Sequence, residues 1–133
     1  MKVAVLGASG RAGSEITKEL AARDHRVTAI ARHPDRIPVA DGVTPVAGDA
    51  QDSAALATLL HGHDAVVSAL HFDVTADMLL SALRQAGVRR LLFTGGAGSL
   101  EVAPGVALID TPEFPEEWKA FAEGGVAFLD ALR

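Results

Sequence analysis

Residues 7–13 read Gly7-Ala8-Ser9-Gly10-Arg11-Ala12-Gly13, and their place between an apolar run and a helical pattern decides the fold. The apolar run covers residues 3–6, and residues 14–22 have the composition of a helix. A helix N-terminus presents unpaired N–H groups and partial positive charge, which favour an anion such as a pyrophosphate. Glycine lets the backbone approach the phosphates and lets the helix pack closely on the strand. The stretch therefore predicts a dinucleotide-binding turn.

The spacing of these glycines is G-x-x-G-x-x-G, one residue longer at the front than the G-x-G-x-x-G fingerprint. The alternative is an ordinary glycine-rich turn between a strand and a helix. The strand before the turn, the helix after it and its position at residue 7 favour the dinucleotide site.

The remaining chain alternates short apolar runs with helical patterns. Expected strands cover residues 2–6, 27–31, 43–46, 65–70 and 89–94, and expected helices cover 13–23, 52–60, 75–86 and 116–132. We expect Asp52 to cap the second helix and Gly87 to end the third. The alternation predicts an α/β fold, a Rossmann-like doubly wound parallel sheet in the order 3-2-1-4-5. Its uniformly apolar strands should be covered by helices on both faces.

A single NAD(P)-binding domain is expected over residues 1–133. Residues 95–133 then form a loop plus a final helix that begin a substrate region, with prolines at 104, 112 and 115 marking an irregular stretch. The sequence ends after that helix, where a doubly wound domain normally continues with another strand. We therefore expect a C-terminal part to be absent.

Composition excludes several classes of protein. Hydrophobic residues make up 49% and charged residues 22%, which is typical of a folded globular chain. The sequence has no apolar run of about 18–20 residues and no signal-peptide pattern, so we expect no membrane partner and a cytoplasmic location. The absence of cysteine agrees with that location. The net charge of −5 argues against nucleic acid. An unpaired edge of the last strand or an unburied final helix would favour a homodimer.

The residue after the second expected strand indicates which dinucleotide binds. An NAD site carries Asp or Glu there for the ribose 2′-hydroxyl, whereas this chain has Arg32, with Arg36 nearby and Arg11 in the glycine loop. Because a guanidinium pairs with a 2′-phosphate, we favour NADP(H) over NAD. Solvated surface arginines are the alternative. Asp49 could meet the adenine or serve as a turn residue.

Ligands in this fold bind beyond the carboxyl ends of the strands. That rule places residues 68–71 and 94–96, including Gly96, beside the nicotinamide, and the polar candidates are Ser68, His71, Thr94 and Ser99. His71 could donate a proton, stack on a ring or be a plain loop residue. His61 and His63 lack a nearby third ligand, so no metal site is expected. Trp118 and Phe114 could line a substrate pocket or close the core, and we favour the core.

Several segments together resemble the atypical short-chain dehydrogenase/reductases, in particular the NAD(P)H-binding group that includes NmrA-like proteins and flavin reductases and is often labelled epimerase/dehydratase. These segments are the glycine loop, residues 29–32, 48–50, 63–70 and 87–100, and the stretch 110–119. The resemblance implies that the loop holds the phosphates, Arg32 the 2′-phosphate and Asp49 the adenine, with Ala69 and Leu70 along the cofactor. The candidate cofactor-binding residues are Gly7, Ser9, Gly10, Arg11, Ala12, Gly13, Arg32, Asp49, Ala69, Leu70, Thr94 and Gly95, and the candidate catalytic residues are His71 and Thr94.

The chain departs from the wider superfamily in one important respect. Superfamily members that reduce ketones or epimerise sugars use Tyr-x-x-x-Lys, but this chain has no tyrosine, and Pro115 stands four residues before Lys119. Reduction of a planar acceptor such as a flavin or quinone does not need that acid. We therefore expect an NADPH-dependent reductase with a small-molecule electron acceptor. The alternative is a non-catalytic NADP-binding redox sensor or regulator, as NmrA-like proteins are.

Overall fold

The structure is a computed structural model that describes residues 1–71, 74–95 and 99–133. Its elements are β1 (Lys2–Leu6), α1 (Arg11–Ala22), β2 (Arg26–Ala31), the 3-10 turn η1 (Pro34–Arg36), β3 (Val43–Ala47), α2 (Ser53–Leu60), β4 (Ala65–Ser68), α3 (Ala76–Ala86), β5 (Leu91–Phe93), β6 (Glu101–Ala103), β7 (Val106–Ala107), the 3-10 turn η2 (Leu108–Asp110) and α4 (Glu116–Leu132). They form two compact units. The first contains Met1–Leu70 and Met78–Thr94, and the second contains His71–Asp77 and Gly95–Arg133.

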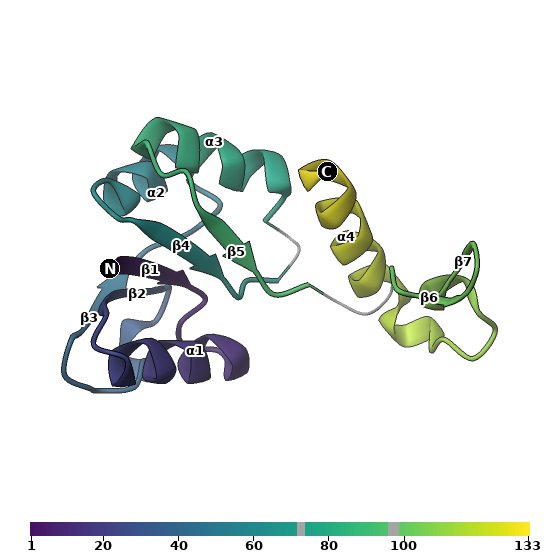
Figure 1. Cartoon of the computed structure of the whole chain (residues 1–133), viewed down its shortest axis with the longest axis horizontal. Helices are drawn as coiled ribbons and strands as arrows, with labels where there is room; N and C mark the ends of the chain where they lie inside the picture. Colours follow the sequence, from purple (N-terminus) through teal and green to yellow (C-terminus); the bar gives the residue numbers. More distant parts are fainter. Residues whose placement is uncertain (72–73, 96–98) are drawn as a thin grey trace. The chain divides into compact units, whose positions relative to one another are not determined.

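The first unit contains a five-stranded parallel sheet in the order β3-β2-β1-β4-β5. This order confirms the predicted Rossmann-like, doubly wound topology. Helix α1 covers one face of the sheet, and α2 and α3 cover the other (Figure 1). Leu6 is in register with Ile30 on one side and with Ser68 on the other, and Ser68 is in register with Phe93. The carboxyl ends of the strands therefore share one edge of the sheet.

The inner strands and α1 form a tight hydrophobic layer. Small and branched side chains of β1 and β2 are buried there, and Ile16 and Leu20 of α1 pack against them. The buried members are Val5, Ala8, Val27, Ala29, Ala31 and Ile37. These apolar runs explain why β1, β2 and β4 are covered on both faces.

The expectation of full burial is wrong for the two outer strands. Thr44, Pro45 and Ala47 of β3 are exposed, and Leu92 of β5 is 46% exposed. Pro45 has no N–H to donate to a further strand, which suits an edge position. Strands β3 and β5 are thus the two edge strands of this sheet, and each pairs with one neighbouring strand of it.

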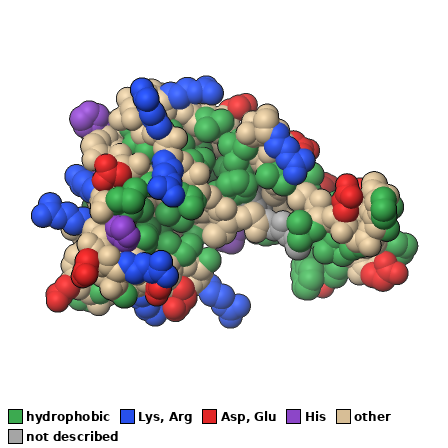
Figure 2. All heavy atoms as spheres, in the orientation of Figure 1, with side chains coloured by type: hydrophobic (Ala, Val, Ile, Leu, Met, Phe, Trp, Pro, Cys, Tyr) green, Lys and Arg blue, Asp and Glu red, His purple; other side chains and the backbone are tan. Residues whose placement is uncertain are grey.

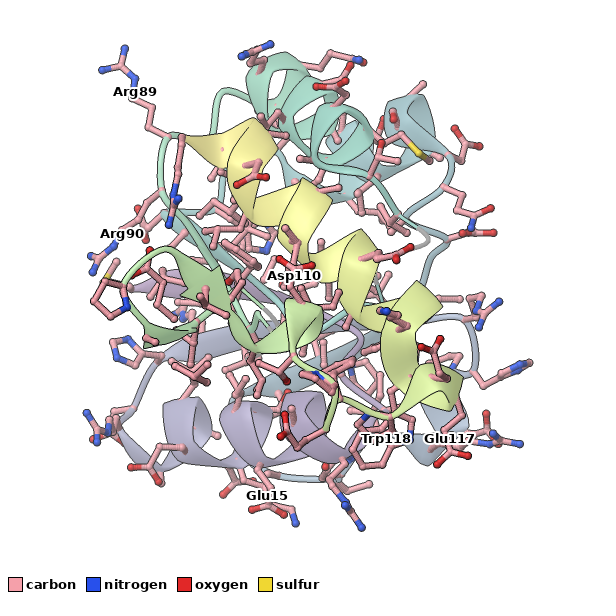
Figure 3. The ribbon with its side chains drawn as sticks, turned by 90° about the vertical axis from the view of Figure 1, so that its right-hand side faces the viewer. Glu15, Arg89, Arg90, Asp110, Glu117 and Trp118 are labelled. Atoms are coloured by element: carbon pink, nitrogen blue, oxygen red, sulfur yellow. The ribbon has the colours of Figure 1, made fainter. Side chains whose placement is uncertain are left out.

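Element ends follow local chemistry. The Asp52 carboxylate accepts a hydrogen bond from the Ala55 N–H at 3.2 Å, which confirms the predicted helix cap. Gly87 follows α3 with a φ of 76°, as expected for a helix end. Strand β5 begins at Leu91 and not at residue 89, and the side chains of Arg89 and Arg90 before it are exposed (Figure 3). Strand β4 ends at Ser68, two residues before the expected end.

The second unit holds α4 and a feature that the sequence reading missed. Strands β6 and β7 pair antiparallel around Pro104 and Gly105, where Gly105 has a φ of 75°. The Pro-Gly pair between apolar residues is a turn signal that could have revealed this hairpin. On the face drawn in Figure 2, hydrophobic and acidic side chains cover the part that contains β6 and β7. None of the helices in the described ranges is long and apolar enough to span a bilayer.

Candidate functional site

Backbone hydrogen bonds gather four segments at the carboxyl edge of the sheet. The glycine loop is tied to β2, the segment after β3 is tied to the end of β2, and the segments after β4 and β5 are tied to their neighbouring strands. The bonds run from Ala8 N–H to the Ile30 carbonyl (3.2 Å), Gly48 N–H to Ala31 (3.0 Å), Ala69 N–H to Leu6 (3.0 Å) and Thr94 N–H to Ser68 (3.0 Å). The first unit therefore brings most of the sequence-predicted cofactor residues to one place.

Two glycines of the loop are required by the protein itself. Gly7 has a φ of 72°, and a Cβ there would lie 2.8 Å from the Ala69 carbonyl oxygen. A Cβ on Gly13 would overlap the carbonyl oxygen of Gly7. Gly7 thus fixes the loop against the end of β4, and Gly13 fixes α1 against the loop.

Gly10 has no such structural reason to be glycine. Its φ of −78° is available to any residue, and among the described residues an added Cβ would meet only the Gly7 carbonyl oxygen, at an ordinary 3.4 Å. Gly10 is also exposed and is the N-cap of α1. From the sequence alone, all three glycines are expected for the same two reasons, which are close approach to the phosphates and close packing of the helix on the strand. The structure distinguishes Gly10 from Gly7 and Gly13. The surface at Gly10 is open, so a phosphate of a ligand could approach it.

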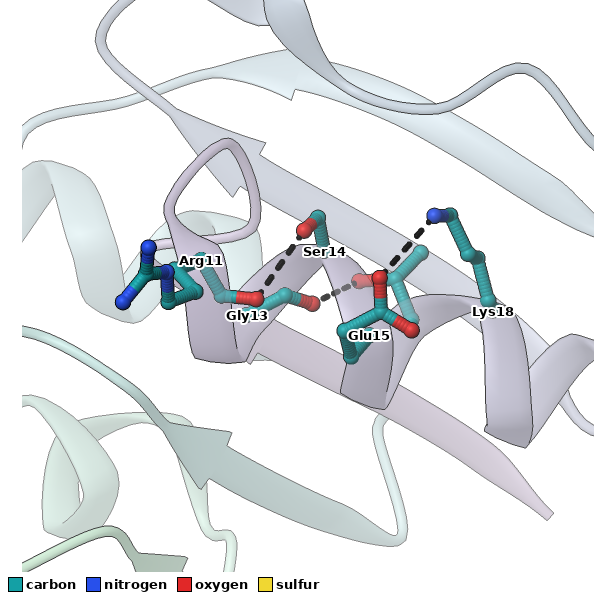
Figure 4. Close-up of polar contacts among 6 residues, drawn as sticks. Arg11, Gly13, Ser14, Glu15 and Lys18 are labelled. Atoms are coloured by element: carbon teal, nitrogen blue, oxygen red, sulfur yellow. Dashed lines mark hydrogen bonds and ion pairs between the residues drawn. The ribbon is translucent and has the colours of Figure 1, made fainter.

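The first turn of α1 is open to an anion. No side chain caps this helix end within the described part of the chain. The Ser14 hydroxyl donates to the Arg11 carbonyl at 3.1 Å, and the Thr17 hydroxyl donates to the Gly13 carbonyl at 2.8 Å (Figure 4). Both hydroxyls thus bond carbonyls and leave the N–H groups of the first turn to a ligand. Arg11 extends away from the helix, and the first turn contains no acidic residue.

Two further arginines follow β2. Arg32 comes directly after the strand and Arg36 ends η1, and both side chains are exposed. In the described ranges, neither guanidinium forms an ion pair with a carboxylate. Both charges are therefore available to a ligand.

Asp49 acts as a turn residue. Its Oδ1 accepts the Gln51 N–H at 3.0 Å, and its carbonyl accepts the Asp52 N–H at 3.1 Å. The turn alternative is confirmed, and a contact between Asp49 and the adenine stays a prediction.

The candidate catalytic residues are divided between the two units. Ser68 is 5% exposed, and Ala69, Leu70 and Thr94 lie at the sheet edge of the first unit. His71 and Gly95 belong to the second unit, as does Ser99, and Gly96 lies outside the described residues. The His71 ring contacts the Phe121 ring edge-on, with centroids 5.6 Å apart and an interplanar angle of 73°. The proton-donor role of His71 remains a prediction.

One histidine of the turn before β4, His63, has a structural role. His63 is buried, and its Nδ1 and Nε2 lie 2.9 Å from the Leu60 carbonyl and 2.7 Å from the Thr28 hydroxyl. Where the structure describes the chain, it contains no group of three His, Cys, Asp or Glu residues that could hold a metal.

The aromatic residues before and in α4 behave differently from the prediction. Trp118 is 59% exposed, so the expectation that it closes the core is wrong, whereas Phe114 is half-buried. Trp118 lies in the first turn of α4, a helix that buries Phe128 instead.

Comparisons with known proteins identify the kind of ligand. The family model for NAD(P)H-binding proteins matches residues 7–124. YwnB, an uncharacterized protein of Bacillus subtilis, is 40% identical over 126 residues, which cover 89% of this chain and 59% of that protein.

Two solved structures are similar over nearly the whole chain. A Burkholderia pseudomallei protein provisionally named an exported protein is 40% identical with a TM-score of 0.86, over 99% of this chain and 66% of that one. A Streptococcus pneumoniae protein provisionally named an NADH-flavin reductase is 34% identical with a TM-score of 0.78. The match covers 99% of this chain and 65% of that one. The chain thus spans about three fifths to two thirds of the length of these relatives.

Proposed function

The chain belongs to the NAD(P)H-binding family, and from this premise we propose that it is an NADPH-dependent oxidoreductase that reduces a flavin, quinone or similar planar acceptor. One observation carries the cofactor half of the proposal. Gly10 is glycine although none of its described neighbours crowds a side chain there, and among the described residues no side chain caps this helix N-terminus. A pyrophosphate against Gly10 explains both facts.

The residues at the sheet edge fit such a cofactor. The N–H groups of the first turn of α1 would bind the pyrophosphate, and Ala69 and Leu70, which the Gly7 loop touches, would lie along the dinucleotide. Buried Ser68 ends β4, exposed Thr94 directly follows β5, and both would border the nicotinamide. When bound, NADPH supplies a hydride.

The preference for NADPH over NADH rests on the arginines. Arg32 stands where an NAD-binding site carries an acid, and the exposed guanidinium of Arg32 is free of described carboxylates. A guanidinium binds a phosphate with two parallel hydrogen bonds, whereas a ribose hydroxyl gains little from it. Arg11 and Arg36 add positive charge to the same unit.

A planar acceptor suits a chain without tyrosine. Reduction of a quinone consumes one hydride and one proton, gives the hydroquinone and converts NADPH to NADP⁺. The proton can come from water or from a weak donor such as His71 or Thr94, so no Tyr-x-x-x-Lys acid is needed. The similarity to a protein named an NADH-flavin reductase supports this acceptor class.

The second candidate is a non-catalytic NADP-binding regulator, favoured by the missing tyrosine. Titration with NADPH and NADH, followed by NADPH oxidation with menadione added, separates the two. Tighter binding of NADPH together with turnover is the expected result. Binding without turnover would favour the regulator, and absence of binding would contradict both functions.

A further inference from the structure

The two units carry opposite charge. The second unit contains nine Asp and Glu residues against two Lys and Arg residues in its sequence, a net charge of −7. The first unit contains eight acidic and ten basic residues, a net charge of +2. The first unit suits an anionic dinucleotide, whereas the second repels anions.

The second unit also exposes aromatic rings. Trp118 is 59% exposed and Phe121 is 55% exposed. Because they are three residues apart in α4, they lie on one face of the helix. The ring of His71 contacts Phe121 from the same unit. We call Trp118, Phe121 and His71 the aromatic cluster.

Acidic side chains surround the cluster along the chain. Glu116 and Glu117 precede Trp118 in the first turn of α4, and Glu123 follows Phe121. Figure 3 places Glu117 next to Trp118 at the start of this helix. Lys119 is the nearest basic residue in sequence, and its ammonium lies 3.4 Å from the Glu116 carboxylate. That ion pair reduces the attraction of Lys119 for an anion.

We propose that the aromatic cluster binds the planar ring of the electron acceptor by stacking, and that this acceptor is uncharged. This inference rests on the proposed function and narrows its substrate class. Exposed aromatic rings bind flat, electron-poor rings through stacking contacts. A phosphate on the acceptor would be repelled by the charge of −7. A quinone or a flavin without phosphate therefore fits, and a flavin mononucleotide does not.

The chain offers a direct reporter for this site. Trp118 is its only tryptophan and it has no tyrosine, so the intrinsic fluorescence comes from the proposed cluster. Riboflavin and FMN share one ring and side chain and differ in the phosphate. In 20 mM salt we expect saturable quenching of Trp118 by riboflavin and at least about fivefold weaker binding of FMN, with the ratio falling toward one in 0.5 M NaCl. Free N-acetyltryptophanamide corrects for absorption by the flavin.

Matched variants test the cluster itself. Phe121→Leu and His71→Leu should each weaken riboflavin binding by about threefold or more, because each removes one stacking ring. Leu100→Ala removes an exposed apolar side chain of the second unit outside the cluster and should leave riboflavin binding unchanged. Circular dichroism shows whether each variant folds.

Two results would overturn the inference: equal affinity for riboflavin and FMN at low salt, or riboflavin binding that Phe121→Leu and His71→Leu leave intact. NADPH binding is measured separately through its own fluorescence. If NADPH binds and riboflavin does not quench Trp118, the acceptor site is wrong while the cofactor half of the proposed function stands. Loss of NADPH binding as well would contradict the proposed function.

Discussion

The three loop glycines differ in what surrounds a side chain at their positions. Gly13→Ala should lower the free energy of unfolding by at least about 2 kcal/mol, because its Cβ would overlap the Gly7 carbonyl. Gly10→Ala should change that free energy by less than about 1 kcal/mol, because its Cβ meets only an ordinary contact. Gly10→Ala should nevertheless weaken NADPH binding by about tenfold or more, since the methyl group would hold the phosphates away.

Urea unfolding and NADPH titration of the same two variants check this pair of expectations. Equal losses of stability would mean that Gly10 is as constrained as Gly13. Unchanged NADPH affinity in a folded Gly10→Ala variant would place the phosphates elsewhere.

Arg32 allows a second test at the residue scale. Charged hydrogen bonds contribute about 1.5–3 kcal/mol, so Arg32→Glu should weaken NADPH binding by about tenfold to a hundredfold. NADH carries no 2′-phosphate, so its affinity should stay the same or rise, because glutamate can accept from the ribose hydroxyl. Isothermal titration of both cofactors gives the ratio. Arg26→Glu, an exposed arginine at the opposite end of the same strand, is the matched control and should leave that ratio unchanged.

At the scale of single elements, α2 depends on its cap. The Asp52 carboxylate bonds the Ala55 N–H, so Asp52→Ala should lower the free energy of unfolding by about 1 kcal/mol. Asp52→Asn keeps an oxygen acceptor, so the free energy of unfolding of this variant should fall only slightly. Thermal unfolding of both variants decides the point, and an equal loss in the two would attribute the effect to charge.

Element prediction succeeded where one local pattern decides the outcome. The apolar runs and the glycine loop predicted the five parallel strands in order, and Asp52 and Gly87 marked the helix ends. The strands expected at residues 65–70 and 89–94 are longer than the observed β4 and β5, because apolarity alone does not tell where pairing with a neighbouring strand stops. The β6–β7 hairpin was missed because its strands are only two or three residues long.

The site was predictable to a similar degree. The rule that ligands bind beyond the carboxyl ends of the strands predicts Ala69, Leu70 and Thr94 at the carboxyl edge of the sheet, and they lie there because parallel strands share that edge. The exposure of Trp118 depends on the packing of α4 as a whole, and the distinction between Gly10 and Gly13 depends on distances of a few tenths of an ångström. Neither property has a signature in the sequence.

At the scale of the whole molecule, the uneven charge makes salt a probe of ligand binding. NADPH carries a 2′-phosphate that NADH lacks, and the unit with the glycine loop and Arg32 has a net charge of +2. Screening shortens the reach of charges to about 8–10 Å at 0.1–0.15 M salt. Raising NaCl from 0.02 to 0.5 M should therefore weaken NADPH binding by several-fold more than NADH binding.

Fluorescence titration of both cofactors across that salt series gives the two slopes. KCl in place of NaCl should give the same slopes, which shows that screening and not a specific ion is responsible. Parallel slopes for NADPH and NADH would mean that no cation of the first unit meets the 2′-phosphate, and the assignment of Arg32 would then be wrong. A steeper slope for NADPH that Arg32→Glu abolishes would attribute the salt effect to that guanidinium, because removal of the charge pair removes what salt can screen.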